Sequence, residues 1–221
     1  MTPDEILQEM YDQTLVGNGP RVLELTHVAL GIDVEPQTLL FDSLIPALEE
    51  VGARFERGDF FVPEMLIAGR AMAGAMEVLR PLLAETGVET IGKFLMGTVQ
   101  GDVHDIGKNL VCIMLEGAGF EVIDLGVQVK PEKFVAAIHE HQPDIVGFSA
   151  FLTTTMPMFK ANLNALVKAG LRDQVLVMVG GAPVTQEYAD AVGADGYAAD
   201  ASATVKKAKV LMRERRAKVS A

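Results

Sequence analysis

Three polar segments of the 221-residue chain contain residue types that can do chemistry. Asp102 and His104 lie two positions apart in the run QGDVHDIGK at 100–108, the hydroxyl-rich run SAFLTTT occupies 149–155, and a glycine pair lies at 180–181. A carboxylate beside a histidine can fix the proton on one ring nitrogen, which leaves the other nitrogen free to act as a base or a metal ligand. The hydroxyl groups could join this network, and adjacent glycines let a ligand pass close to the backbone.

The same segments also have plainer interpretations, and other chemistries find little support. An Asp-x-His pair in a loop can simply cap a helix, and a glycine pair can be a turn. Cys112 is the single cysteine, so no disulfide forms within the chain, and its apolar neighbours predict a buried helical residue rather than a nucleophile. His104 lacks a second histidine or cysteine at zinc-ligand spacing, and no glycine-rich phosphate loop is present. His27, His139 and His141 lie among charged residues in predicted helices and are assigned no function.

From residue 93 onward, short apolar runs alternate with amphipathic stretches. Strands that alternate with helices of this kind predict βαβ units and a parallel sheet covered on both faces. The pattern fits a flavodoxin-like doubly wound α/β fold with five parallel strands, in which ligands bind beyond the carboxyl ends of the strands. Each of the three polar segments follows a predicted strand, so we expect them to meet at that edge. The predicted strands are 94–99, 121–125, 145–148, 175–179 and 196–198, and the predicted helices are 106–116, 131–141, 156–169, 184–192 and 203–215.

The first part of the chain has a helical pattern instead. Four segments begin near a proline or a polar break, and apolar residues recur in them at steps of three and four, which predicts amphipathic helices. Short connections between these segments predict a small antiparallel four-helix bundle. We expect a helical domain at 1–88 and the α/β domain at 89–221, joined by a linker at 84–93. The predicted helices are 3–16, 20–32, 36–57 and 62–86.

Composition and charge exclude several classes of protein. Hydrophobic residues make up 49 % and charged residues 22 %, which excludes a disordered or collagen-like chain. Acidic residues outnumber basic ones by 30 to 19, a net charge of −11, which argues against binding to nucleic acid or to anionic membranes. The acidic N-terminus shows no signal peptide, and no uninterrupted run of 18 apolar residues predicts a membrane span. We expect a cytoplasmic protein.

The spacing of the polar segments adds a resemblance to a known family. Asp-x-His-x-x-Gly at 102–107, Ser-x-Phe at 149–151 and Gly-Gly at 180–181 are separated by 41 and 28 residues, and together they resemble the cobalamin-binding motif. Family members usually show Ser-x-Leu at the middle position, so Phe151 is a departure in apolar shape. Residues 36–86, with the run RFERGDFFVPE, resemble the helical cap module of cobalamin-dependent methionine synthase. The whole chain is similar to the corrinoid proteins of methylamine, methanol, betaine and methoxyaromatic methyltransferase systems.

The resemblance implies roles for the residues that match the motif. His104 would be the lower axial ligand of cobalt in a bound corrinoid, in place of the cofactor's own dimethylbenzimidazole. Asp102 would hold the other ring nitrogen, and Thr155 matches the hydroxyl that completes a proton relay. The remaining matches are Gly107 in the motif itself, Ser149, Phe151 and Thr153 along the slot for the nucleotide tail, Gly180 and Gly181 where that tail passes the sheet, and Phe55 and Val62 in a cap over the upper face.

The resemblance also implies a cofactor, partners and an activity. The cofactor would be cobalamin or a related corrinoid, which cycles between cob(I)alamin and methylcob(III)alamin. A substrate-specific methyltransferase would supply the methyl group, and a second methyltransferase would pass it to a folate or a thiol. A reductive activase is a further expected partner. The protein would carry the methyl group and would not be a catalyst on its own.

Three alternatives share part of this pattern. An adenosylcobalamin mutase subunit would bring a barrel that holds the substrate, for which the chain is too short. A cobalamin-sensing regulator would need a DNA-binding helix-turn-helix, and the 35 residues before the matching cap are acidic and too few. A response-regulator-like sheet without a cofactor would need an acidic cluster and a lysine after a late strand, and both are missing. We therefore favour the methyl carrier.

Overall fold

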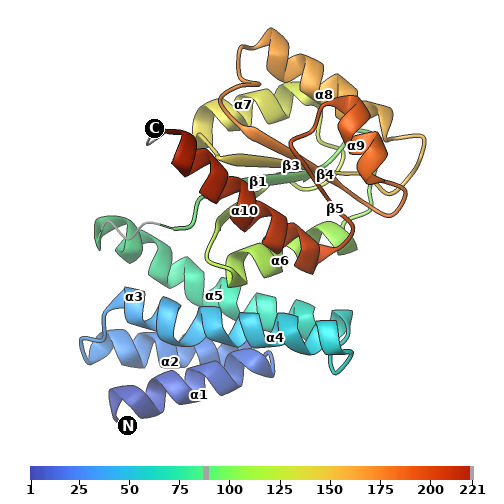
Figure 1. Ribbon diagram of the computed structural model, residues 1–221. Coiled ribbons are helices and arrows are strands. Elements are labelled where there is room, and N and C mark those ends of the chain that lie inside the picture. The colour runs from blue at the N-terminus through green and yellow to red at the C-terminus, as the bar shows by residue number, and fades with distance from the viewer. Residues whose placement is uncertain (87–89, 220–221) are drawn as a thin grey trace. The chain divides into compact units, whose positions relative to one another are not determined.

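The computed structural model describes residues 1–86 and 90–219 (Figure 1). The chain divides into two compact units, one formed by residues 1–89 with 116–119 and the other by residues 90–115 with 120–221. The predicted boundary between residues 88 and 89 lies outside the described residues, as does part of the predicted linker at 84–93.

The first unit is a bundle of helices, as predicted. Thr2 begins it with a capping box, in which its hydroxyl accepts the Glu5 N–H while the Glu5 carboxylate accepts the Thr2 N–H. Prolines in the first turns of the following helices have no N–H to leave unpaired. Buried apolar stripes meet in the bundle core. The helices are α1 (Pro3–Leu15), α2 (Gly19–Gly31), α3 (Pro36–Leu39), α4 (Ile45–Arg57) and α5 (Val62–Thr86).

One predicted helix is not regular along its length. In place of a single helix at 36–57, the structure has α3, a π-helical turn η1 (Leu40–Leu44) and α4. The Ile45 N–H donates to the carbonyl of Leu40, five residues back, instead of four. Pro46 explains the change, because it has no N–H and its ring would clash with the carbonyl of Asp42 in a regular α-helix.

The second unit is a five-stranded parallel sheet with the order β2-β1-β3-β4-β5, which confirms the flavodoxin-like doubly wound fold. Four of its strands differ from the predicted bounds by one residue at one or both ends, and the fifth matches them. The strands are β1 (Lys93–Thr98), β2 (Glu121–Asp124), β3 (Ile145–Ser149), β4 (Leu176–Gly180) and β5 (Gly196–Ala198). The helices are α6 (Ile106–Gly117), α7 (Pro131–His141), α8 (Pro157–Lys168), α9 (Gln186–Val192) and α10 (Ala201–Val219).

Helices cover both faces of this sheet, with α7 and α8 on one face and α6 and α10 on the other (Figure 1). The core under α7 and α8 is aromatic: Phe134, Phe148 and Phe159 are fully buried, and the rings of Phe134 and Phe148 meet edge to face with centroids 4.8 Å apart. Phe148 belongs to β3, so this cluster anchors the central strand. The loop that follows β3 therefore starts from a rigid position.

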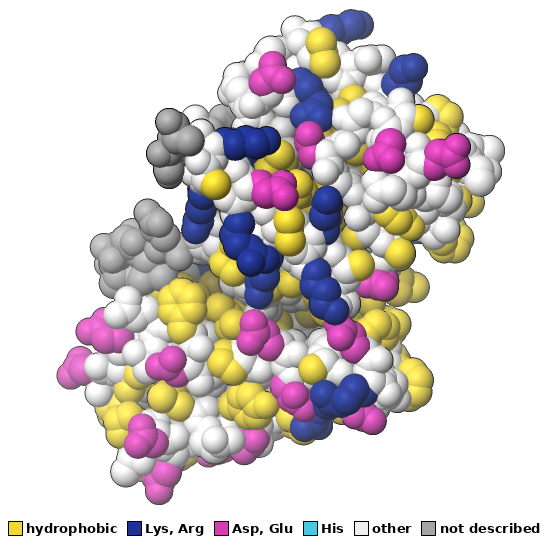
Figure 2. Space-filling model, in the orientation of Figure 1, with side chains coloured by type: hydrophobic (Ala, Val, Ile, Leu, Met, Phe, Trp, Pro, Cys, Tyr) yellow, Lys and Arg dark blue, Asp and Glu magenta, His cyan; other side chains and the backbone are white. Residues whose placement is uncertain are grey.

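Charge is unevenly divided along the chain. Residues 1–89 contain 16 acidic and 5 basic side chains, whereas residues 90–221 contain 14 of each. Within the second unit, seven basic side chains and one acidic one lie on α10, and the lysines and arginines gather along that helix in Figure 2. The net negative charge of the protein thus comes from the helical unit. No helix in the described part of the chain has the length and apolar character needed to cross a membrane.

Candidate functional site

The loops after β1 and β3 meet at the point where the strand order reverses. β1 lies between β2 and β3, and the chain leaves β1 toward one side of the sheet and β3 toward the other. Loops at such a switch point diverge and open a crevice at the carboxyl edge of the sheet. The predicted polar segments at 100–108 and 149–155 both lie there, as their order along the chain indicated.

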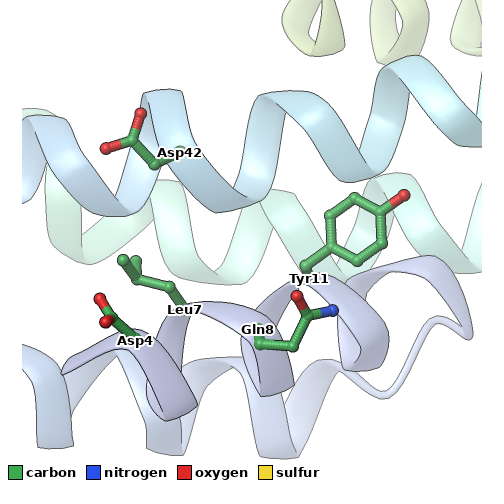
Figure 3. Close-up of a pocket in the computed structure, with 5 residues that line it drawn as sticks. All are labelled: Asp4, Leu7, Gln8, Tyr11 and Asp42. Carbon is green, nitrogen blue, oxygen red and sulfur yellow. The ribbon is translucent and has the colours of Figure 1, made fainter. Parts of the chain in front are cut away.

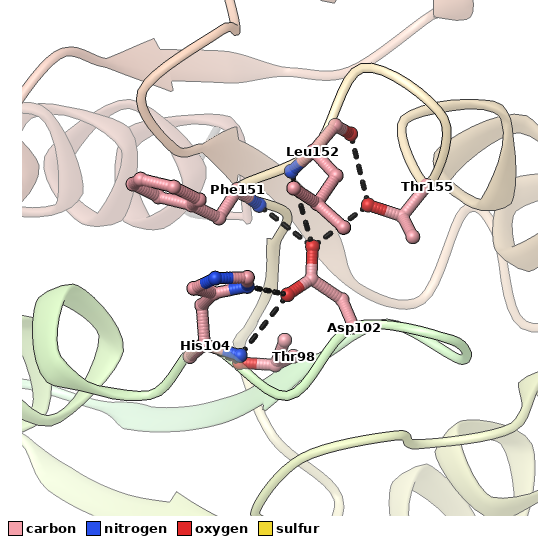
Figure 4. A network of polar contacts seen from close by, with 6 residues as sticks. All are labelled: Thr98, Asp102, His104, Phe151, Leu152 and Thr155. Carbon is pink, nitrogen blue, oxygen red and sulfur yellow. Dashed lines mark hydrogen bonds and ion pairs between the residues drawn. The ribbon is translucent and has the colours of Figure 1, made fainter.

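Asp102 joins the two loops. Its side chain is completely buried, and its two oxygens accept five hydrogen bonds (Figure 4). Oδ1 accepts the backbone N–H of His104 at 3.0 Å and lies 2.8 Å from His104 Nδ1. Oδ2 accepts the backbone N–H groups of Phe151 at 2.8 Å and Leu152 at 3.3 Å, and the hydroxyl of Thr155 at 2.7 Å. A residue of the first loop is thereby fixed by the second.

Asp102 is ionised in this setting. Burial alone would raise the pKa of its carboxyl group, but the hydrogen bonds from Thr155, from the backbone of His104 and Phe151 and from the His104 ring outweigh burial and hold that pKa well below its usual range. An ionised carboxylate can only accept hydrogen bonds, so Nδ1 of His104 carries a proton. In the neutral ring, Nε2 then has a free lone pair.

Two further contacts hold His104. Its backbone carbonyl accepts the hydroxyl of Thr98 at 3.0 Å, which fixes the backbone of the loop to the end of β1. Its imidazole stacks on the ring of Phe151, with centroids 4.3 Å apart and an angle of 25° between the planes. The side chain remains 44 % exposed. The geometry therefore presents a pre-oriented imidazole, with Nε2 as the nitrogen available to a ligand.

Thr155 has a choice of acceptors. Its single hydroxyl proton lies within reach of Asp102 Oδ2 at 2.7 Å and of the Leu152 carbonyl at 2.9 Å. The residue is buried just before α8, in the turn that also supplies the Leu152 amide. Thr155 can therefore strengthen or release its hold on the carboxylate by rotating one bond.

Ser149, Gly180 and Gly181 lie at the ends of β3 and β4. Ser149 is in register with Thr98 on one side and Gly180 on the other. Gly181 has a φ of +133°, and a Cβ built there would overlap the carbonyl oxygen of Ala150 and lie 2.8 Å from its carbonyl carbon. The structure thus gives a reason for glycine at this position that the sequence did not suggest, namely the close approach of two loops.

The other predicted residues lie outside the Asp102 network. Gly107 is in the first turn of α6, and a Cβ at that position would face open space. Thr153 is exposed in the loop after β3. Phe55 at the end of α4 and Val62 at the start of α5 are half-buried side chains of the helical unit.

An apolar rim lies along the loops at the carboxyl edge of the sheet, and the sequence did not draw attention to it. It consists of five exposed apolar side chains from the loops after β1, β2 and β3 and from the start of α6, namely Val103, Ile106, Val127, Phe151 and Leu152. Exposed apolar side chains gathered in one place mark a surface that is covered in function. The signal in the sequence is an apolar residue in a loop, which periodicity does not detect.

The helical unit contains a separate pocket of about 220 Å³. It is lined by Asp4, Leu7, Gln8, Tyr11 and Asp42, which come from α1 and η1 (Figure 3). None of these residues belongs to the histidine network. Among the described residues no three His, Cys, Asp or Glu side chains are grouped to hold a metal ion.

Comparison with known proteins shows that this is a cobalamin-binding protein. Family models of the B12 binding domain match residues 92–206 and residues 6–80. The chain is 42 % identical to the dimethylamine corrinoid protein of Methanosarcina barkeri, over 96 % of this chain and all of that one, and 39 % identical to trimethylamine corrinoid protein 1 of Methanosarcina acetivorans, over 95 % and 98 %. It belongs to the family of B12-binding corrinoid proteins.

Solved structures agree. The methanol:cobalamin methyltransferase complex MtaBC of Methanosarcina barkeri contains a similar chain. The alignment covers 95 % of the present chain and 80 % of the MtaBC chain, with a TM-score of 0.83 and 28 % identity. A cobalamin-binding protein from Desulfitobacterium hafniense aligns over 96 % and 98 %, with a TM-score of 0.68 and 31 % identity. The predicted fold and family are thus confirmed.

The residues at the switch point fit a corrinoid. A corrin ring brings its own equatorial ligands to cobalt, so the protein needs to add one nitrogen rather than a cluster, and His104 offers Nε2 alone. The macrocycle is broad and largely apolar, and the apolar rim would cover it. The open space beside Gly107 leaves room at the start of α6.

Proposed function

We propose that this protein carries a methyl group between two methyltransferases on a corrinoid held by His104, and that it is not a catalyst on its own. The observation that carries the proposal is the imidazole fixed by a buried, ionised Asp102 with Nε2 left free. When bound, the corrinoid supplies a cobalt centre that takes up and releases the methyl group. Ser149, Phe151, Thr153, Gly180 and Gly181 are proposed to receive its nucleotide tail, and Gly107 to make room for it.

Three side chains are proposed to control the nitrogen ligand and its proton, namely His104, Asp102 and Thr155. Asp102 keeps the Nδ1 proton in place and increases the electron donation of Nε2, as a carboxylate does for a metal-bound histidine. The carboxylate would keep the imidazole in the same orientation whether or not Nε2 is bound to a metal. The Thr155 hydroxyl weakens or strengthens the carboxylate as an acceptor, depending on which of its two partners it faces.

The names of the relatives support one of the proposed partners. Those reported above carry the names of di- and trimethylamine corrinoid proteins, which favours a methylamine-specific methyltransferase as donor and argues against a mutase subunit or a sensor. A second methyltransferase with a folate or thiol acceptor, a reductive activase and a cytoplasmic location stay predictions from the sequence. Nucleic acid and membranes are not proposed as partners.

A methyl-uptake experiment tests this function. The protein is loaded with cobalamin, reduced chemically, and mixed separately with methylamine-specific and methanol-specific methyltransferases and their substrates. We expect the absorbance of the methylated cofactor to appear with a methylamine and its enzyme, and not with methanol. A loaded and reduced protein that takes up no methyl group from any methylated amine would contradict the proposal.

Asp102→Asn tests the proton relay. An amide keeps the shape of the carboxylate but loses its charge and one acceptor oxygen, so the histidine becomes a weaker donor to the metal. We expect the affinity for cobalamin to fall by about 10- to 100-fold, and the cobalt(II)/cobalt(I) midpoint to become less negative because the higher oxidation state loses donor strength. Spectroelectrochemistry across a range of pH values measures this midpoint.

Thr155→Val and Thr155→Ser are the matched variants for this prediction. Valine removes the hydroxyl without changing the shape. The carboxylate then loses a donor at Oδ2 and becomes a stronger acceptor for the His104 ring, so valine should make the midpoint more negative, opposite to Asp102→Asn. Serine keeps the hydroxyl and should give the wild-type value. A midpoint that is the same in all four proteins at every pH would show that Asp102 and Thr155 do not act on the metal.

Phe55 and Val62 are proposed to shield the upper face of the cofactor. They flank the turn between α4 and α5, and the neighbouring Phe61 is the most exposed large apolar side chain among the described residues. Domains at 1–88 and 89–221 would have to separate when a methyltransferase needs that face, with hinge positions at Gly87 and Gly92. Gly87 lies outside the described residues.

Photolysis tests the shielding. In Phe55→Ala loaded with methylcobalamin, we expect light to remove the methyl group several-fold faster than in wild type, because an aromatic cover is lost and the radical pair recombines less often. Phe41→Ala is the matched control, since Phe41 is an exposed phenylalanine of η1 in the same unit. Equal photolysis rates in wild type and Phe55→Ala, both folded and loaded, would mean that the turn between α4 and α5 does not cover the cofactor.

A further inference from the structure

Lys108 is a buried cation in an unfavourable place. It lies in the first turn of α6, two residues after the helix begins, and is 2 % exposed. The positive end of the helix dipole repels a cation there, and loss of hydration adds to the cost. A lysine in this position is retained only where its partners compensate, so its partners indicate what it does.

Those partners connect α6 to the end of β2. The ammonium group forms a close ion pair with Oδ2 of Asp124, and it donates to the side-chain oxygen of Asn109 at 2.6 Å. Oδ1 of Asp124 accepts the backbone N–H of Gly126 at 2.9 Å. The Asn109 amide in turn donates to the carboxylate of Asp105, the neighbour of His104, at 3.3 Å.

The loop after β2 is in turn bonded to the loop that carries His104. The Gln128 N–H donates to the carbonyl of Asp102 at 3.0 Å, and the Thr98 N–H donates to the carbonyl of Gly126 at 2.9 Å. Val99 and Val129 form a parallel bridge beside them. Asp124 therefore lies at a junction. One of its oxygens holds the start of α6, and the other holds the loop that binds the backbone carbonyl of Asp102.

We infer that Lys108 and Asp124 are positioning residues that hold His104 ready for the corrinoid before the cofactor binds. Their ion pair closes a ring of contacts that runs from α6 through β2 and the loop at 125–129 to the backbone of Asp102. This ring fixes the backbone on which the imidazole stands, whereas Asp102 and Thr155 fix the imidazole itself. The inference rests on the proposed function of His104 as the axial ligand.

Lys108→Met tests this positioning, because methionine keeps an apolar stem and removes the ammonium group. In the protein without cofactor, we expect the amide hydrogens of His104, Gly126 and Gln128 to exchange at least 10-fold faster than in wild type, relative to core amides of β3. Relative exchange separates a local loosening from a general loss of stability. Affinity for cobalamin should fall about 10-fold, and the nitrogen splitting in the electron paramagnetic resonance spectrum of bound cob(II)alamin should weaken.

Arg172→Met is the matched control. Arg172 pairs with Asp195 in the same unit, at 3.0 Å, but these residues precede β4 and β5 and so lie at the amino edge of the sheet. This variant should leave all three measurements at their wild-type values. Should Lys108→Met not fold, Asp124→Asn removes the ion pair with the side-chain shape kept and should give the same local change.

The outcomes separate this inference from the proposed function. Suppose that His104→Ala loses the nitrogen splitting, whereas Lys108→Met keeps the wild-type relative exchange and cobalamin affinity. This result would overturn the positioning role and leave His104 as the ligand. Absence of that splitting in the loaded wild-type protein would overturn the proposed ligand and the inference with it. Faster relative exchange and a weakened splitting in Lys108→Met, with neither change in Arg172→Met, would support the positioning role and the proposed ligand.

Discussion

His104→Ala should give a folded protein whose bound methylcobalamin has a changed visible spectrum and whose affinity for cobalamin is lower by about 100-fold or more. Mutation of the groups that orient a metal-bound histidine typically costs 10- to 100-fold, and the ligand itself should cost at least the upper value. Folding should survive, because the side chain is 44 % exposed and Asp102 keeps four donors from the backbone and Thr155. Titration with methylcobalamin, followed by absorbance, measures both effects.

His139→Ala is the control for this variant. His139 is an exposed histidine of α7 with no part in the Asp102 network, so its removal changes the histidine content without touching the site. We expect its spectrum and affinity to match the wild type. If the spectrum of His104→Ala equals that of His139→Ala, the lower ligand of cobalt is not His104.

The meeting of Asp102 with the loop after β3 could be predicted from the sequence. Parallel strands bring their carboxyl ends to one edge, so a loop that follows one strand must lie near the loop that follows its neighbour. Asp102 and Thr155 are 53 residues apart in the chain and share a hydrogen bond for this reason. The hydrogen-bonding role of Thr155 came from the family resemblance, because a threonine in a run of three has no local feature that distinguishes it.

The support beneath the site could not be predicted in the same way. Lys108 in an amphipathic helix has the pattern of a solvated residue, and only its pairing with Asp124 across two elements makes it a buried one. The bond from the Gln128 N–H to the Asp102 carbonyl involves backbone atoms that every residue has. The stacking of Phe151 on His104 likewise depends on how two loops cross. Each of these contacts joins two separate elements or loops, whose relative placement periodicity does not specify.

Gly181→Ala should have the largest effect on stability, because the added methyl group has no space. It would overlap the carbonyl oxygen of Ala150, and φ of +133° is unfavourable for alanine, so we expect a loss of about 3 kcal/mol or more in the free energy of unfolding. The same displacement reaches the site, since Ala150 precedes the Phe151 and Leu152 amides that bind Asp102. Cobalamin affinity should therefore fall by about 10-fold or more.

Gly193→Ala separates the overlap from the backbone strain. Gly193 also has a positive φ, +86°, but an added Cβ there meets no atom within 4 Å. Alanine at this position should cost about 1 kcal/mol from strain alone and leave cobalamin affinity unchanged. Urea unfolding of both variants and titration with cobalamin make the comparison. Equal losses of stability at 181 and 193 would show that the two loops can move apart at little cost, and the geometry of the Asp102 network would then not depend on the glycine pair.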